Sequence, residues 1–254
     1  MRPLPLAAVP PTTLHLLMKL HLLLSSCLLA SSCASTAYDS KLQTWGELRS
    51  VLRDGETQGR VALTQAARPG TYGLGAIAGL HGELLVADGV VWVSCATAPD
   101  AVEPARPPIA GEQATLLALA TVAEWETSEL RDISDVTALE RAVRAAAEAA
   151  GLDPTQPFPF VVDGTVTALD LHVLNGACPF ASPAPPPERA PYRSELERTD
   201  VMLVGFHAEG MAGKLTHHGS SSHIHVLTGG SPAVVGHVDD LQLLDGAQLR
   251  VPRR

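Results

Sequence analysis

Three histidines near the end of the chain have the residue type and spacing of a metal site. His223 and His225 are separated by one residue, and His237 follows after a Gly-Gly-Ser-Pro segment. The valines and the isoleucine around them favour strands, in which residues two positions apart point to the same face. A turn over residues 228–232 would place His237 on the neighbouring strand. Three imidazoles that converge in this way predict a zinc site with a fourth position open to water or substrate.

A simpler interpretation is that these histidines are polar residues on the outward face of an alternating strand. The other histidines are less distinctive. His217 and His218 lie in a segment rich in Gly, Ser and Thr, which predicts a solvated turn, and His81 is expected at the surface. Asp239 or Asp240, just after His237, could orient a ligand imidazole through a hydrogen bond.

The elements that would position these residues follow from the periodicity of the apolar residues. Helical spacing predicts one helix over residues 40–53 and another over 135–150, where Thr137 and Glu140 resemble a capping box and Gly151 a stop signal. Asp-Gly pairs at 88–89 and 163–164 predict hairpins over residues 82–93 and 158–173. Further strands are expected at 201–206, 238–244 and 248–251, with a proline-rich loop at 177–191. Residues 115–125 also have a strand-like pattern, although their Leu and Ala content leaves a helix open.

This pattern predicts an α+β fold with mixed or antiparallel sheets and few helices. We expect three parts along the chain. An export segment would occupy residues 1–33, an N-terminal half residues 40–150, and a β-rich half carrying the metal site residues 151–254.

The composition indicates a globular protein whose core is built from aliphatic side chains. Of the 254 residues, 46% are hydrophobic but only 4% are aromatic, so Ala, Val and Leu must fill the interior. The formal net charge is −9 without a cluster of basic residues, which argues against nucleic acid and favours a small-molecule substrate. Cys95 and Cys178 could pair outside the cytoplasm or could both be small buried side chains.

The N-terminal segment has the pattern of a secretory signal. A leucine-rich run over residues 14–30 contains Lys19 as its only charge and is followed by small residues. The residues before Cys27 and before Cys33 each resemble a bacterial lipobox, so we expect an exported protein that could carry a lipid anchor. The alternative is an uncleaved transmembrane anchor, which the short apolar run and Lys19 disfavour.

Several short motifs occur in the order typical of one family. They are Gly73-Leu74-Gly75, Gly82-Glu83-Leu84-Leu85, Asp163-Gly164, Pro191-Tyr192, Val204-Gly205-Phe206, His223-Ile224-His225 and Gly236-His237-Val238. In the order and spacing of these motifs the chain resembles the α-acetolactate decarboxylase family. The resemblance covers roughly residues 42–252.

The resemblance implies a zinc enzyme that converts 2-acetolactate to acetoin and carbon dioxide. It also implies two similar α/β halves in tandem, usually in a dimer. The zinc-binding histidines of the family fall on His223, His225 and His237, and its active-site glutamate falls on Glu83. Burial on a strand would raise the pKa of the Glu83 carboxyl and suit it to proton transfer, whereas a solvent-facing Glu83 would have no such role.

The sequence departs from the family pattern at three places, one of which is the proline-rich loop at 177–191, longer than its family counterpart. The family arginine, which would bind the substrate carboxylate, is replaced by His172, for which a partly buried structural role is the alternative. The family tail returns an acidic residue to the metal, whereas this sequence stops at Pro252-Arg253-Arg254, and we expect that acid to be missing.

Three functions therefore remain open. The first is zinc-dependent decarboxylation of 2-acetolactate, and the second is the same fold acting on another hydroxy-keto or ester substrate. The third is a zinc-binding protein without turnover. A cupin-like barrel also uses a His-x-His motif, but it normally places a glutamate soon afterwards, and residues 226–235 contain none.

Overall fold

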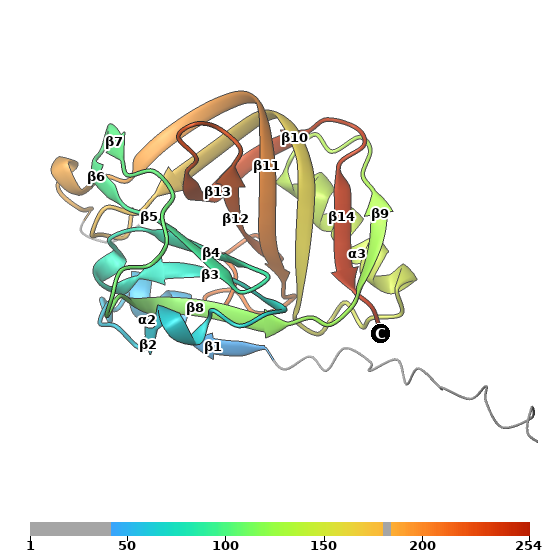
Figure 1. The fold of residues 1–254 in the computed structure, drawn as a ribbon, viewed down its shortest axis with the longest axis horizontal. Coiled ribbons are helices and arrows are strands. Elements are labelled where there is room, and N and C mark those ends of the chain that lie inside the picture. Colours follow the sequence, from blue (N-terminus) through green and yellow to red (C-terminus); the bar gives the residue numbers. More distant parts are fainter. Residues whose placement is uncertain (1–41, 180–183) are drawn as a thin grey trace, which may run out of the picture. The chain divides into compact units, whose positions relative to one another are not determined.

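The computed structural model describes residues 42–179 and 184–254. The expected export segment, with Cys27 and Cys33, lies outside the described residues. Two antiparallel sheets dominate the described part (Figure 1). The first has the strand order β1-β8-β3-β4-β5, with β2 also beside β8: β1 (Gln43–Trp45), β2 (Val61–Ala62), β3 (Thr71–Ile77), β4 (Glu83–Ala87), β5 (Val90–Ser94) and β8 (Gln113–Thr121).

The first sheet confirms the hairpin expected around residues 88–89. Asp88 and Gly89 have φ angles of 48° and 76°, as a two-residue turn between β4 and β5 requires. Strand β3 is buried along its whole length, and a Cβ atom at Gly75 would lie 2.0 Å from the carbonyl oxygen of Leu116 on β8. Only glycine permits this close approach, which packs β3 tightly in the middle of the sheet.

The second sheet contains the C-terminal strands and one strand from the middle of the chain. Its order is β11-β12-β13-β10-β14-β9: β9 (Trp125–Glu129), β10 (Phe158–Val173), β11 (Tyr192–His207), β12 (Ser222–Thr228), β13 (Val235–Leu243) and β14 (Gln248–Pro252). Because β11 also pairs with β10 along its whole length, β10, β11, β12 and β13 form a closed circuit of hydrogen-bonded strands. This circuit holds β12 and β13 in a fixed register.

The hairpin expected around Asp163-Gly164 is wrong, because both residues lie inside the continuous strand β10. Gly164 does not form a turn, and its missing side chain instead allows a neighbouring segment to pack closely. A Cβ atom there would lie 2.5 Å from the Cβ atom of Ala247, on the segment before β14. Asp163 pairs with Arg250 on the adjacent strand β14. An Asp-Gly pair can therefore form a turn or lie inside a strand where a glycine is needed for close packing. The sequence pattern alone does not distinguish the two.

Two α-helices occur in the described residues, α2 (Leu48–Leu52) and α3 (Val136–Ala149). The helix expected over residues 40–53 is wrong in its first half, where β1 pairs with β8. Gly46 separates β1 from α2, since its φ of 74° fits neither element. Helix α3 is as expected, but its N-cap is Asp135, which accepts a hydrogen bond from the Ala138 N–H at 2.6 Å. Thr137 is therefore not the cap.

Short elements complete the fold. A two-stranded ribbon and three single turns of 3-10 helix connect the larger elements: β6 (Ala96–Ala98), β7 (Ala101–Val102), η1 (Leu63–Gln65), η2 (Ala78–Leu80) and η3 (Pro187–Arg189). Among the described residues, no helix has the length and apolar character needed to span a membrane. The Cys95 thiol is free and lies 3.6 Å from an Arg106 nitrogen, so the disulfide alternative is not what the structure contains.

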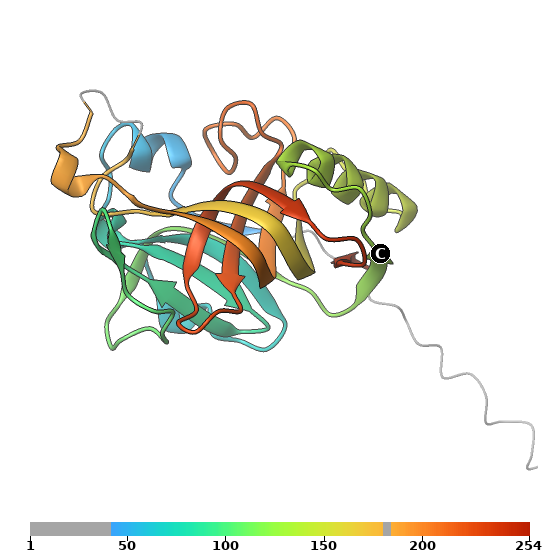
Figure 2. The ribbon, with the colours of Figure 1, turned by 90° about the horizontal axis from the view of Figure 1, so that it is seen from above.

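Two packing layers position the functional residues. Helix α3 covers one face of the second sheet, with Leu139 and Val143 fully buried against it (Figure 2). The other face meets the first sheet, and Leu85 packs with Val161, Val204 and Val235 between them. The expected α+β class with few helices is confirmed, and its sheet pairings are antiparallel. Strand β9 belongs to the second sheet and α3 packs against that sheet. The chain therefore passes from the first sheet to the second near residue 125.

Candidate active site

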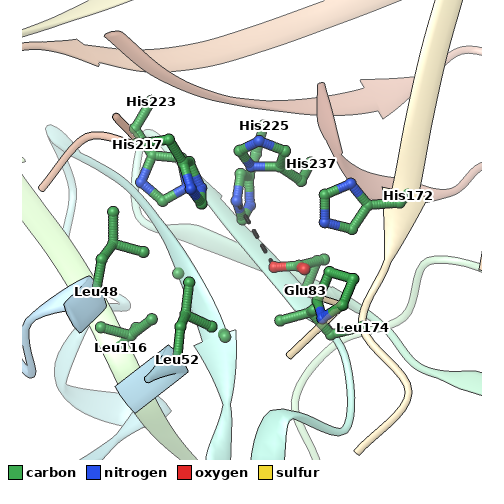
Figure 3. A pocket seen from close by; sticks show the side chains of 13 residues that line it. Leu48, Leu52, Glu83, Leu116, His172, Leu174, His217, His223, His225 and His237 are labelled. Atoms are coloured by element: carbon green, nitrogen blue, oxygen red, sulfur yellow. Dashed lines mark ion pairs between the residues drawn. The ribbon is translucent and has the colours of Figure 1, made fainter. Parts of the chain in front are cut away.

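The two sheets, α2 and the loop at residues 208–221 enclose a pocket (Figure 3). Its empty volume is about 380 Å3 including the open mouth. The structure brings His223, His225 and His237 together there. His223 and His225 lie on the same face of β12, and His237 of β13 is directly opposite His225. The turn at residues 229–234 therefore returns the chain in the register that the sequence predicts.

Hydrogen bonds fix the orientation of the strand histidines. The Nδ1–H of His223 donates to the carbonyl oxygen of Leu215 at 3.0 Å, and that of His225 donates to the carbonyl oxygen of Leu84 at 2.9 Å. In the neutral form each ring then keeps its lone pair on Nε2. These rings lie 5.0 Å apart between centroids, and both line the pocket. The arrangement presents imidazole nitrogens as metal ligands.

Burial keeps these imidazoles neutral. It lowers the pKa of His225 to about 3 and lowers the pKa values of His223 and His237 well below the usual range. The nearby imidazoles add to this effect, because two positive charges in one buried site repel each other. Neutral imidazole is the form that binds a metal ion.

His217 was expected in a solvated turn, and that expectation is wrong. Its ring lines the pocket, with its centroid 5.5 Å from that of His223 and 5.0 Å from that of His237. The reason is that Leu215 and Thr216 are buried and draw the loop inward, whereas His218 stays exposed. The ligand atoms of His217, His223 and His237 lie within 4.8 Å of one another, so the structure brings His217 into the imidazole cluster.

Glu83 begins β4 and projects into the same pocket from the first sheet. Its side chain is 4% exposed, and its Oε2 atom lies 3.6 Å from Nε2 of His225. Burial raises the pKa of Glu83 to about 8, a backbone hydrogen bond at Leu174 opposes this rise, and the charge of Asp239 adds to it. The alternative of a solvent-facing Glu83 is therefore excluded, and the carboxyl is protonated in the metal-free pocket near neutral pH.

His172 reaches the pocket from β10, where it is directly opposite His237. Its Nδ1 lies 2.8 Å from Oδ1 of Asp239, and Arg193 donates to the other oxygen of Asp239 at 2.8 Å. Asp239 is the unopposed residue of a β-bulge in β13, which lets it turn toward His172. The sequence pointed to Asp239 or Asp240 as an orienting acid. Asp239 orients His172, and Asp240 instead accepts from the Val136 N–H at the start of α3.

The opposite wall of the pocket is apolar, which the sequence pattern did not reveal. Leu48 and Leu52 of α2, Leu116 of β8 and Leu174 line it (Figure 3). No local signal marks these leucines, since leucines of the core have the same appearance in a sequence. They enclose the polar cluster on one side and leave space for a small ligand with an apolar part.

Comparison with known proteins assigns this architecture to a family. Residues 47–253 match the sequence model of the alpha-acetolactate decarboxylase family. The chain therefore belongs to the α-acetolactate decarboxylase family. A search of the curated proteins finds no match.

Solved structures share the fold. The alpha-acetolactate decarboxylase of Bacillus subtilis strain 168 superposes with a TM-score of 0.67 at 17% identity, covering 84% of this chain and 86% of that one. The acetolactate decarboxylase of Bacillus subtilis subspecies spizizenii gives the same values. A Staphylococcus aureus protein of unknown function, similar to alpha-acetolactate decarboxylase, has a TM-score of 0.64 at 15% identity, with 84% and 85% covered. Family and fold indicate a decarboxylase of the acetolactate type.

Proposed function

We propose that this pocket binds a zinc ion and decarboxylates 2-acetolactate to acetoin and carbon dioxide. The observation that carries the proposal is a buried carboxyl group, Glu83, at 3.6 Å from a cluster of neutral imidazoles. The pocket thus joins imidazole nitrogens suited to a metal ion with an acid whose pKa is raised to about 8 when no metal is present.

The donor set fits zinc. His223, His225 and His237 would hold the ion, because their nitrogens line one pocket and the Nδ1–H groups of His223 and His225 are already used by backbone carbonyls. Imidazole nitrogen is a preferred zinc ligand. When bound, the ion would act as a Lewis acid that draws electron density from the oxygen atoms of the substrate.

Glu83 would supply the proton. Breaking the bond between C2 and the carboxylate releases carbon dioxide and leaves its electron pair on the remaining hydroxy-ketone fragment. That fragment needs one proton on carbon to become acetoin. Glu83 donates this proton from one side of the pocket and recovers one from solvent, so each turnover consumes a single proton. Its fixed place on β4 directs the proton to one face of the fragment.

The remaining residues would orient and enclose the substrate. His172, held by Asp239, directs Nε2 toward the pocket, where in the neutral form it accepts a hydrogen bond from a hydroxyl group. The leucines of the opposite wall would contact the methyl groups of acetolactate and exclude water. His172 lacks the guanidinium fork with which an arginine binds a carboxylate through two parallel hydrogen bonds, so we expect slow turnover.

The test compares wild type with Glu83→Gln at equal zinc content, measuring acetoin released from racemic acetolactate. Glutamine keeps the shape but cannot deliver a proton, so we expect the rate to fall about 10²–10⁴-fold while zinc stays bound. The exposed Glu195, changed to Gln, is the matched control and should act as wild type. Equal rates in Glu83→Gln and wild type would remove Glu83 from the mechanism.

A second candidate function is zinc binding with a different hydroxy-keto substrate, or without turnover. The specific observation in its favour is His172 in place of the family arginine, since its Nδ1 is already bonded to Oδ1 of Asp239 at 2.8 Å and an imidazole lacks the guanidinium fork that grips a carboxylate. Zinc-loaded wild type that releases no acetoin from acetolactate would favour this candidate.

A further inference from the structure

His217 is a pocket histidine outside the three ligands of the proposed function. It projects from the loop at residues 208–221, beside His223 (Figure 3). One ligand nitrogen each of His217, His223 and His237 lie within 4.8 Å of one another. Zinc bonds of about 2.1 Å place tetrahedral nitrogens about 3.4 Å apart, so a small inward movement of the rings would complete this set.

Helix α3 anchors the end of this loop. Glu140 accepts hydrogen bonds from the Ser220 hydroxyl at 2.6 Å and from the backbone N–H groups of Ser221 and Ser222 at 2.9 and 2.8 Å. One carboxylate oxygen thus holds three donors just before β12 begins. The loop is therefore fixed to the second sheet at its C-terminal end.

Helix α2 and His223 anchor the middle of the loop. The N–H groups of Leu48 and Arg49 donate to the carbonyl oxygens of residues 214 and 213 at 3.0 and 2.7 Å. The carbonyl oxygen of Leu215 accepts from Nδ1 of His223 at 3.0 Å. The same loop therefore sets the tautomer of His223 and carries His217 two residues later, so both rings are positioned together.

We propose that His217 is a metal ligand in this chain and adds a fourth imidazole to His223, His225 and His237. The inference rests on the metal site of the proposed function and extends it. Three histidines leave one zinc position open, whereas four fill a tetrahedral ion. His217 would thus hold the ion more firmly and occupy the place where substrate oxygen would bind. Substrate would have to displace His217 or share a five-coordinate ion with it.

The experiment measures zinc affinity of the full chain by competition with a chelating indicator, together with the visible spectrum of the cobalt(II)-loaded protein. His217→Ala and His217→Gln are compared with His218→Ala, which changes the adjacent exposed histidine. Loss of a residue that only orients a ligand costs about 10–100-fold in metal affinity, so loss of a ligand should cost at least about tenfold. Circular dichroism of the metal-free variants checks that each one is folded.

We expect both His217 variants to bind zinc at least about tenfold more weakly than His218→Ala. Their cobalt spectra should be shifted, because water, an oxygen ligand, replaces an imidazole nitrogen in the coordination sphere. Wild-type affinity and an unchanged cobalt spectrum in both His217 variants would overturn the inference.

His223→Ala separates the two proposals. If it keeps full zinc affinity, the metal site itself is wrong and the inference fails with it. If it loses zinc while the His217 variants do not, only the inference fails.

Discussion

The two walls of the pocket are built differently. The second sheet supplies strand imidazoles from β10, β12 and β13, whereas the first sheet supplies Glu83 beside a leucine surface that continues onto α2. The imidazole wall is rigid, because its strands belong to a closed hydrogen-bonded circuit. The opposite wall combines one acid with apolar surface, which desolvates that acid and raises its pKa. In this site one sheet therefore provides the imidazoles, and the other sets the protonation of Glu83 and encloses the pocket.

The imidazole wall should weaken most when a strand histidine is removed. His237→Ala leaves a gap between His225 and His172 that no neighbouring strand residue fills. We expect zinc affinity to fall by more than the roughly tenfold loss expected for His217, so that zinc content drops well below one per chain and acetoin release is lost. Metal analysis of the purified protein measures this, with His81→Ala as the surface control. Full zinc content in His237→Ala would mean that the second sheet does not hold the metal.

A smaller effect is expected when the imidazole wall is kept but one of its orienting contacts is lost. Asp239→Asn can donate to Nδ1 of His172 and so favour the wrong tautomer. We expect kcat/KM for acetolactate to fall about 10–100-fold with zinc content unchanged. Arg193→Met, which removes only the exposed partner of Asp239, should have little effect. If the two variants were equally impaired, the pair between Arg193 and Asp239 would matter as much as the contact between Asp239 and His172.

The sequence predicted the imidazole wall better than the apolar wall, for a physical reason. Strand geometry has a period of two, which puts His223 and His225 on one face, and a short turn can bring His237 beside them. His217 depends on where a loop is anchored, and its anchors, such as Glu140 of α3, are distant in sequence. The apolar wall carried no signal, because a leucine that lines a pocket and a leucine of the core look the same.

The same limit explains the errors in the fold. An Asp-Gly pair makes a turn at residues 88–89, where φ is positive at both positions. At residues 163–164 it lies inside a strand, because Gly164 is needed for the close approach of Ala247. Gly46 likewise ends β1 before α2, since a Cβ atom there would lie 2.4 Å from the carbonyl oxygen of Thr115. Both of these errors concern a glycine that is required by a neighbour distant in the sequence.

The two walls should also oppose each other in the pH dependence of stability. His223, His225 and His237 stay neutral in the folded metal-free protein but gain protons in the unfolded chain below about pH 6.5. The unfolded chain then binds more protons, so stability falls as the pH drops through this window. Glu83 acts in reverse. Its pKa of about 8 lies above the usual value of 4.5, so its contribution is lost as the pH rises between these values.

We therefore expect the metal-free protein to lose stability when the pH is lowered from 6.5 to 5, by roughly 1 kcal/mol per pH unit for each buried histidine. Urea unfolding at both pH values measures this. His225→Asn should show a shallower loss, whereas the exposed His218→Asn should match wild type. Stability that does not change between these pH values would mean that the metal-free pocket admits water and protonates its histidines.

The smallest change tests the apolar wall alone. Leu52 of α2 lines the pocket and is only partly buried, so Leu52→Ala should fold with little loss of stability. It removes apolar contact from the side of the pocket opposite the imidazoles, where we place the methyl groups of acetolactate. One methylene group of lost contact corresponds to about 0.8 kcal/mol, or roughly fourfold in kcat/KM.

Zinc affinity should not change, because no ligand is touched. Leu244→Ala, an exposed leucine at 42% that does not line the pocket, is the matched control. A change in zinc affinity without a change in kcat/KM would assign Leu52 to the metal wall and remove the division between the two sides.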